Sequence, residues 1–122
     1  MPNHVVAVID DLFFTVKIHA AAKRCGLPIT FVKSEVDALL QARESPVLII
    51  LDLNCTAVDQ LHLIAALKAQ PETKSIPILA FVAHVQGELK VQAQKAGCDM
   101  VLARSAFSQN LPQLLQRYSS RP

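Results

Sequence analysis

Five short apolar runs alternate with amphipathic segments along the whole chain, and this alternation restricts the fold more than any other feature. Four runs are continuous and β-branched: Val5–Ile9, Val47–Leu51, Ile76–Val82 and Met100–Ala103. The fifth run, Ile29–Val32, is more polar. Runs without polar alternation are typical of strands that are buried on both faces of a parallel sheet.

Amphipathic segments that favour helices lie between these runs. The apolar positions of the first segment recur every three or four residues: Phe14, Ile18, Ala21 and Cys25. Gly26 follows them, and glycine is a common residue at the end of a helix. Residues 57–70 and 89–96 show a similar pattern before Pro71 and Gly97, so the sequence predicts a helix in each.

Two further helices have recognisable signals near their start. Ser34–Asp37 fits a capping box, which predicts a helix from this point. We expect that helix to turn three apolar side chains toward the core: Val36, Leu39 and Leu40. The last helix is predicted to begin near Asn110, because Pro112 is then tolerated in its first turn.

Together, the predicted strands and helices form a succession of strand–helix units with short connections. Such a succession requires right-handed crossovers and predicts an α/β fold, a doubly wound (βα)5 three-layer sandwich with a five-stranded parallel sheet. The length of 122 residues suits one hydrophobic core. We therefore expect residues 1–122 to form a single domain, without an output domain after Tyr118.

Composition excludes several classes of protein. The chain has 12 Lys and Arg against 10 Asp and Glu, with no basic run, which argues against binding of nucleic acid. Three cysteines without a CxxC pair argue against a disulfide framework or a zinc site. With only three glycines there is no nucleotide-binding loop. The apolar runs are too short for a membrane span, so we expect a cytoplasmic protein without membrane contact.

Charged residues follow the ends of three predicted strands. Asp10 and Asp11 follow the first strand, Asp52 follows the third and Arg104 follows the fifth. In open parallel sheets ligands bind at this edge, so the side chains are expected to converge there. Neighbouring carboxylates repel one another unless a cation is present, and Mg²⁺ prefers such oxygen ligands. One carboxylate can then accept a phosphoryl group, although any single aspartate could instead cap a helix.

At this point the chain resembles the response-regulator receiver domains, which are the CheY-like family. The resemblance covers essentially the whole chain and is carried by these segments: Val8–Asp11, Leu51–Asn54, Asp59, Ile76–Leu79, Ala96–Asp99, and Arg104 ahead of Phe107. It implies the strand order 2-1-3-4-5. It also implies a signalling domain rather than an enzyme, with at most autocatalytic phosphoryl transfer and hydrolysis.

The resemblance assigns roles to individual residues. Asp52 matches the phosphoacceptor, Asp11 the direct Mg²⁺ ligand and Asp10 its water-mediated or hydrogen-bonding neighbour. Asn54 falls where the family supplies a backbone carbonyl to the metal, and Arg104 stands at the position of the lysine that contacts the phosphoryl group. The implied phosphodonor is a histidine kinase, a histidine phosphotransfer protein or a small acyl phosphate.

The sequence departs from the family in the residues that transmit the signal. Val82 replaces the Thr or Ser at the end of the fourth strand, and Val101 replaces the coupling aromatic residue. Arg104 is not equivalent to lysine at a tight site. Ser105 replaces the proline that normally follows, so no cis peptide is expected. The loop after Asp52 also differs, with residues 55–60 where the family often has Met-Pro and a glycine.

Two regions remain as candidate modulators or contacts. His84 follows the fourth strand and could influence the access of water to an acyl phosphate. The family's usual partner surface consists of the fourth helix, the fifth strand and the fifth helix. In this chain it would include the following polar residues: Glu88, Gln92, Lys95, Gln109 and Gln113.

Two functional hypotheses follow from these residues. The first is a phosphorylatable receiver domain of a two-component phosphorelay, with atypical transmission of the signal. The second is a pseudo-receiver that binds a partner protein without being phosphorylated and keeps its acids for capping or metal binding. The first predicts Mg²⁺-dependent modification of Asp52, and the second predicts none.

Overall fold

The computed structural model describes residues 3–83 and 87–119, in which strands and helices alternate along the chain. The strands are β1 (Val5–Val8), β2 (Ile29–Val32), β3 (Leu48–Asp52), β4 (Ile78–Val82) and β5 (Met100–Ala103). The helices are α1 (Leu12–Arg24), α2 (Glu35–Ala42), α3 (Gln60–Ala69), α4 (Glu88–Ala96) and α5 (Arg104–Ser119). No helix in these ranges is long and apolar enough to cross a membrane.

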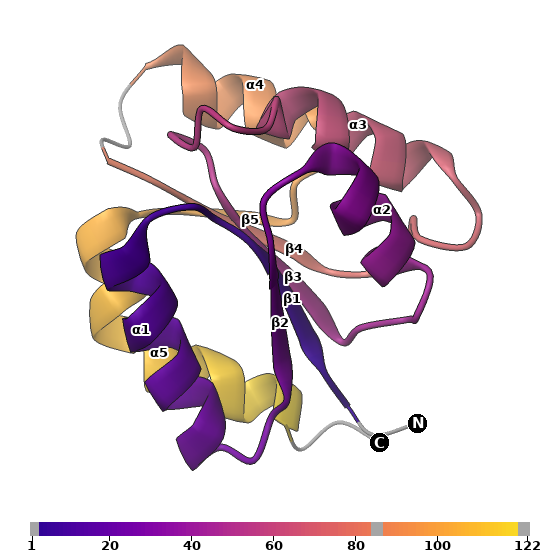
Figure 1. The fold of residues 1–122 in the computed structure, drawn as a ribbon. Coiled ribbons are helices and arrows are strands. Elements are labelled where there is room, and N and C mark those ends of the chain that lie inside the picture. The colour runs from indigo at the N-terminus through magenta and orange to yellow at the C-terminus, as the bar shows by residue number, and fades with distance from the viewer. Residues whose placement is uncertain (1–2, 84–86, 120–122) are drawn as a thin grey trace.

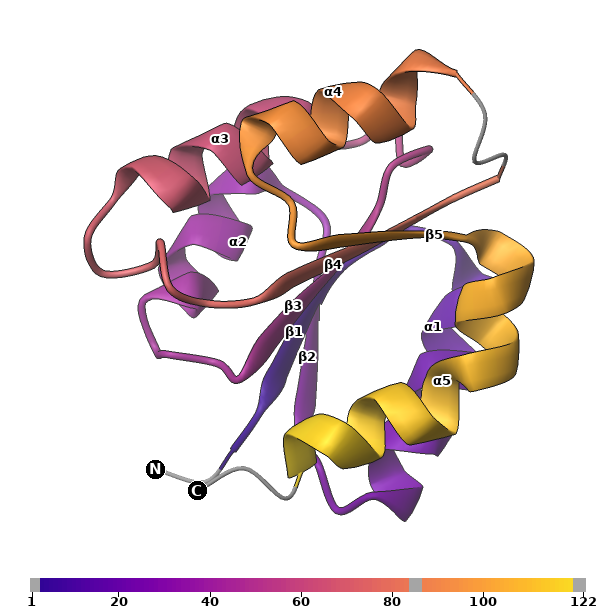
Figure 2. The same cartoon turned by 180° about the vertical axis from the view of Figure 1, so that it is seen from behind.

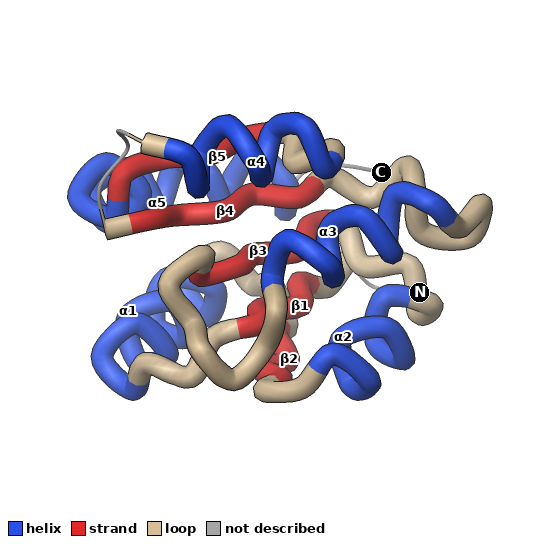
Figure 3. Tube along the Cα trace, turned by 90° about the horizontal axis from the view of Figure 1, so that it is seen from above, coloured by secondary structure: helices blue, strands red, loops and turns tan. Residues whose placement is uncertain are grey.

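The strands form one parallel sheet in the order β2-β1-β3-β4-β5, which confirms the predicted topology. Figure 3 shows the strands side by side with α2, α3 and α4 in front of them. β3 lies in the centre, between β1 and β4. Each residue of β1, β3 and β4 is buried, which explains why these runs are apolar on both faces.

Helices cover both faces of the sheet, so the molecule has three layers. Figures 1 and 2 show α1 and α5 together on one side and α2, α3 and α4 on the other. Alternate residues of β1 show how one strand serves both cores. Val6 and Val8 pack on the side of α2, α3 and α4, whereas Val5 and Ala7 pack on the side of α1 and α5.

Short polar side chains fix where three helices begin. Asp11 accepts a hydrogen bond from the Phe14 N–H of α1, and Ser34 accepts one from the third residue of α2. Asp59 does the same for α3. These are N-caps, and the one at Ser34 confirms the helix start predicted there. Gly97 follows the last residue of α4 and has a φ of 113°, a backbone conformation that favours glycine.

The prediction for the start of the last helix is wrong. α5 begins at Arg104 rather than near Asn110, so Pro112 lies in its interior. A proline at this position removes one backbone hydrogen bond from the helix. The helix nevertheless continues because it buries an apolar stripe against the sheet, which outweighs the local preference. The buried residues of this stripe are Phe107, Leu111, Leu114 and Leu115.

The predicted orientation of α2 is wrong in part. Val36 and Leu40 are exposed by 67% and 55%, and Ala38 and Ala42 face the core in their place. Leu39 is half-buried and packs against that core. The small alanines allow α2 to approach the sheet closely, and this close approach leaves the larger side chains on the outside.

Candidate functional site at the carboxyl edge of the sheet

Asp52 is the final residue of the central strand β3 and is only 3% exposed. Its Oδ1 accepts a hydrogen bond of 2.9 Å from the backbone N–H of Asn54. Burial raises the pKa of the Asp52 carboxyl above its ordinary value, and the charges of Asp11 and Asp10 raise it further. The Asn54 N–H and the charge of Arg104 oppose this shift. Asp52 is therefore a poorly solvated carboxylate that a nearby cation would stabilise.

Asp10 and Asp11 lie in the connection between β1 and α1, beside Asp52. Asp10 is exposed and Asp11 is half-buried. One carboxylate oxygen of Asp11 caps α1 through a 3.2 Å hydrogen bond from the Phe14 N–H. The structure brings these two acids close enough to Asp52 to raise its pKa, as the strand-end argument predicted. We call Asp10, Asp11 and Asp52 the acidic corner.

The acidic corner has donor atoms of the kind that Mg²⁺ prefers. Within the described ranges, no three side chains of His, Cys, Asp or Glu are arranged to hold one metal ion. Mg²⁺ commonly keeps several waters and needs only one or two carboxylates, so three acids are not required. The negative charges of Asp11 and Asp10 are among the causes that raise the pKa of Asp52. A bound divalent cation would offset this repulsion between the carboxylates. The donor set is therefore compatible with Mg²⁺.

Asn54 joins the ends of two neighbouring strands. Its backbone N–H donates to Asp52, and its side-chain Oδ1 accepts a hydrogen bond of 2.7 Å from the N–H of Ala83, next to β4. The resemblance to receiver domains implied only a backbone-carbonyl role for this residue. No periodic pattern signals the side-chain contact, because Asn54 and Ala83 are far apart in the sequence.

Arg104 begins α5 and lies over the ring of Phe14, with its Cζ 5.5 Å from the ring centroid. The ring belongs to an aromatic layer in which Phe81 stacks on Phe107 with centroids 4.5 Å apart, and Phe14 lies 5.0 Å from Phe81. Among the described residues Arg104 forms no ion pair, and its buried Nε has no hydrogen-bond acceptor. Its charge lowers the pKa of Asp52, so the guanidinium acts on the acidic corner without direct pairing.

Val82 and Val101 are 2% and 8% exposed and belong to the same hydrophobic core. Val82 is the last residue of β4 and Val101 is the second residue of β5. Both side chains face α2, α3 and α4. Neither side chain has a polar atom that could change hydrogen-bond partners. We call Val82 and Val101 the valine pair. His84, the predicted modulator, lies outside the described residues.

Of two buried residues near the acidic corner, Cys55 was interpreted from the sequence as a residue that fills space, and Gln60 was not recognised as important. Gln60 is 4% exposed, and its side-chain amide donates hydrogen bonds to backbone carbonyls at the ends of β1 and β3. Cys55 is buried, and its burial, together with the charge of Asp10, raises the pKa of its thiol. A protonated thiol is a poor nucleophile, so Cys55 is a packing residue at this site.

The fold is that of receiver domains in solved structures. The receiver domain of a sensor histidine kinase from Pseudomonas aeruginosa, solved with a magnesium ion in its active-site cleft, aligns with a TM-score of 0.83 at 21% identity. That alignment covers 99% of this chain and 100% of the other. A chemotaxis response regulator of Vibrio cholerae aligns with a TM-score of 0.82 at 22% identity over 97% of this chain and 99% of that one.

A third solved structure, the receiver domain of a histidine kinase from Syntrophus aciditrophicus, aligns with a TM-score of 0.81 at 20% identity. It covers 97% of this chain and 90% of the other. No model of a known protein family matches the chain, and no curated protein sequence matches it. The chain therefore has the response-regulator receiver fold, at 20–22% sequence identity to these three structures.

Proposed function

We propose that this chain is a signalling receiver domain of a two-component phosphorelay and accepts a phosphoryl group on Asp52. The observation that carries the proposal is the setting of Asp52. It is a buried carboxylate at the end of the central strand, with two further acids and an arginine charge acting on it. A single capping aspartate would not account for this convergence at the edge where parallel sheets bind ligands.

The chain's own groups suit nucleophilic attack by Asp52. The Asn54 N–H engages Oδ1, so we expect Oδ2 to attack the phosphorus of the donor. A bond from Oδ2 to phosphorus forms while the bond between phosphorus and the donor's imidazole nitrogen or acyl oxygen breaks. The leaving group keeps that electron pair, and in the case of imidazole it takes up a proton. Hydrolysis later returns the free carboxylate and inorganic phosphate.

Asp10, Asp11, Asp52 and Asn54 are the residues that would hold Mg²⁺ at this site. When bound, the ion would offset the negative charge shared by the acids and the phosphoryl oxygens. Arg104 adds a second, permanent positive charge. Its buried Nε has no acceptor among the described residues, which leaves a donor for a phosphoryl oxygen.

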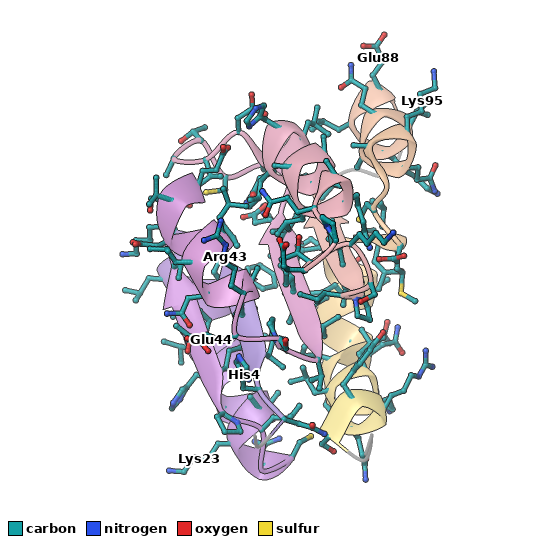
Figure 4. The ribbon with its side chains drawn as sticks, turned by 90° about the vertical axis from the view of Figure 1, so that its right-hand side faces the viewer. His4, Lys23, Arg43, Glu44, Glu88 and Lys95 are labelled. Carbon is teal, nitrogen blue, oxygen red and sulfur yellow. The ribbon has the colours of Figure 1, made fainter. Side chains whose placement is uncertain are left out.

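The partners that we propose follow from this chemistry. A histidine kinase, a histidine phosphotransfer protein or a small acyl phosphate would supply the phosphoryl group in the cytoplasm. The downstream partner would bind the surface of α4, β5 and α5. Figure 4 shows Glu88 and Lys95 pointing outward from α4, and both are exposed. We propose no role in nucleic-acid or membrane binding.

A second candidate function is a pseudo-receiver that binds its partner without phosphorylation. Two observations favour it. Asp11 already has a structural role as the cap of α1, and the valine pair offers no hydroxyl to a phosphoryl group. The two functions differ in one respect that can be measured, which is covalent modification of Asp52.

The test is the intact mass of the protein after incubation with Mg²⁺ and a small acyl phosphate. We expect the wild type to gain one phosphoryl group. Asp52→Asn should gain none, and the matched control Asp59→Asn should behave as the wild type, because Asp59 is an exposed cap of α3. Absence of the gain in the wild type with acyl phosphates and with purified histidine phosphotransfer proteins would favour the pseudo-receiver. A gain that persists in Asp52→Asn would place the acceptor elsewhere.

A further inference from the structure

Gln60 makes a side-chain contact with the backbone at the ends of two strands. It is the first residue of α3 and follows the cap Asp59. Its side-chain Nε2 donates one hydrogen bond of 2.9 Å to the carbonyl of Val8 and another of 3.1 Å to the carbonyl of Asp52. These are the last residues of β1 and β3, the two strands that carry the acidic corner.

The orientation of the Gln60 amide follows from its partners. Both neighbouring groups are carbonyl oxygens, so the NH₂ group must face them and the Oε1 atom must face away. Oε1 is buried and has no donor within the described residues. A buried acceptor without a partner is unfavourable. The chain thus tolerates an unpaired oxygen in order to place two donors at the strand ends.

The contact lies where the pairing of β1 with β3 ends. The register of the two strands runs from Val5 opposite Leu48 to Val8 opposite Leu51. Beyond Val8 the chain leaves β1 and leads to Asp10 and Asp11, and β3 ends one residue after Leu51, at Asp52. The Gln60 amide therefore links the last paired residue of β1, Val8, to Asp52, the residue after the last paired residue of β3. The Asp52 carbonyl also accepts from the Cys55 N–H, so both of its lone pairs are engaged.

We infer that Gln60 is a positioning residue that holds the ends of β1 and β3 together and so sets the separation between Asp10–Asp11 and Asp52. This inference rests on the proposed function for its chemical consequence. Gln60 is buried and contacts backbone only, so it would touch neither the phosphodonor nor solvent. It would act on the geometry of the carboxylates, to which phosphoryl transfer is sensitive.

The first test measures the strand ends themselves and does not depend on phosphorylation. Gln60→Met has a similar shape but no donor, and the matched control is Gln94→Met on the exposed face of α4. We expect Gln60→Met to accelerate amide hydrogen exchange at Asn54 and Cys55, whose N–H groups donate to Asp52, while exchange in β4 and β5 stays at the wild-type rate. Unchanged exchange at these two amides would overturn the inference.

The second test separates positioning from simple loss of structure. The phosphorylation rate constant is measured against the concentrations of acyl phosphate and of Mg²⁺. We expect Gln60→Met to lower the maximal rate constant on the order of tenfold to a hundredfold, with an unchanged half-saturating concentration of the donor. Partial unfolding would instead lower the fraction of protein that reacts and leave its rate constant unchanged. Equal rate constants in Gln60→Met and Gln94→Met would overturn the inference.

A further variant guards against misfolding of Gln60→Met. Gln60→Gly removes the whole side chain and adds no apolar group at the strand ends, so it is expected to fold. It should show the same faster exchange at Asn54 and Cys55. If the wild type takes up no phosphoryl group, the proposed function fails, and the exchange measurement alone decides whether Gln60 holds the strand ends.

Discussion

The acidic corner lies at the carboxyl edge of the sheet and the valine pair within β4 and β5, and the two regions differ in the kind of side chain that they contain. The acidic corner consists of carboxylates in three environments, of which one is buried, one caps a helix and one is exposed. The valine pair is buried in one apolar core and has no polar atoms. The first region has the groups that phosphoryl chemistry needs, and the second lacks those that a switch needs.

This difference separates two tasks that a receiver domain combines. The chemistry proposed at Asp52 requires charges held in place, and the acidic corner with Arg104 would meet that requirement. Transmission requires an element with two alternative arrangements. Val82 and Val101 have no second hydrogen-bonding position, and close packing resists their movement. We therefore expect the response to phosphorylation to stay near the acidic corner instead of passing through the valine pair.

The largest expected effect comes from adjacent residues of β4 that face opposite sides of the sheet. Phe81→Ala should lower the free energy of unfolding by about 3–5 kcal/mol, because Phe81 is fully buried between Phe14 and Phe107. Val82→Ala should cost only about 2 kcal/mol for the loss of two methyl groups. Urea denaturation measures both. Equal losses would show that the aromatic layer under Arg104 contributes no more to stability than the valine core does.

A smaller effect is expected from Val82→Thr, which adds the hydroxyl that the family commonly has. The side chain is buried among apolar neighbours, so the hydroxyl should lower the free energy of unfolding by about 1–3 kcal/mol. In return, the lifetime of the phosphorylated form should change, because one donor is added near the phosphoryl group. Unchanged stability in urea would mean that the hydroxyl finds a partner, and that the valine pair is less strictly apolar than described.

The smallest effect is on the stability of the protein when the buried carboxylate is removed. The pKa of Asp52 is raised in the folded state, chiefly by burial, so its ionised form opposes folding. Asp52→Asn should therefore raise the free energy of unfolding by about 0.5–2 kcal/mol at neutral pH without Mg²⁺. The gain should shrink as the pH falls from the raised pKa towards the ordinary value of 3.8, below which the wild-type carboxyl is neutral in both the folded and the unfolded state. A variant less stable than the wild type at neutral pH would contradict this account.

Most of the fold could be predicted from the sequence because its signals are local. Continuous apolar runs predicted the buried strands, and Ser34 predicted a helix start that its hydrogen bond to Asp37 confirms. Local signals failed where tertiary packing decides the outcome. Burial of the Phe107 stripe carries α5 through Pro112, and close packing of small residues in α2 leaves Val36 exposed.

The candidate site could be predicted only in outline. The strand-end rule identified Asp52 and its acidic neighbours, since the carboxyl ends of parallel strands meet at one edge. The contacts that organise the site join residues far apart in the chain and follow no period. The Gln60 amide on Val8, the Asn54 oxygen on the Ala83 N–H, and Arg104 over Phe14 are of this kind.

The most direct test of the contrast between the two regions is the change in backbone amide chemical shifts when the protein is phosphorylated. Wild type and Asp52→Asn would be compared with Mg²⁺ and a small acyl phosphate. We predict shift changes at Leu53, Asn54 and the junction of β1 with α1 in the wild type only, with Val101 and α4 unchanged. Changes of similar size along β5 and α4 would contradict the account. The same shift changes in wild type and Asp52→Asn when the acyl phosphate is added would contradict it as well.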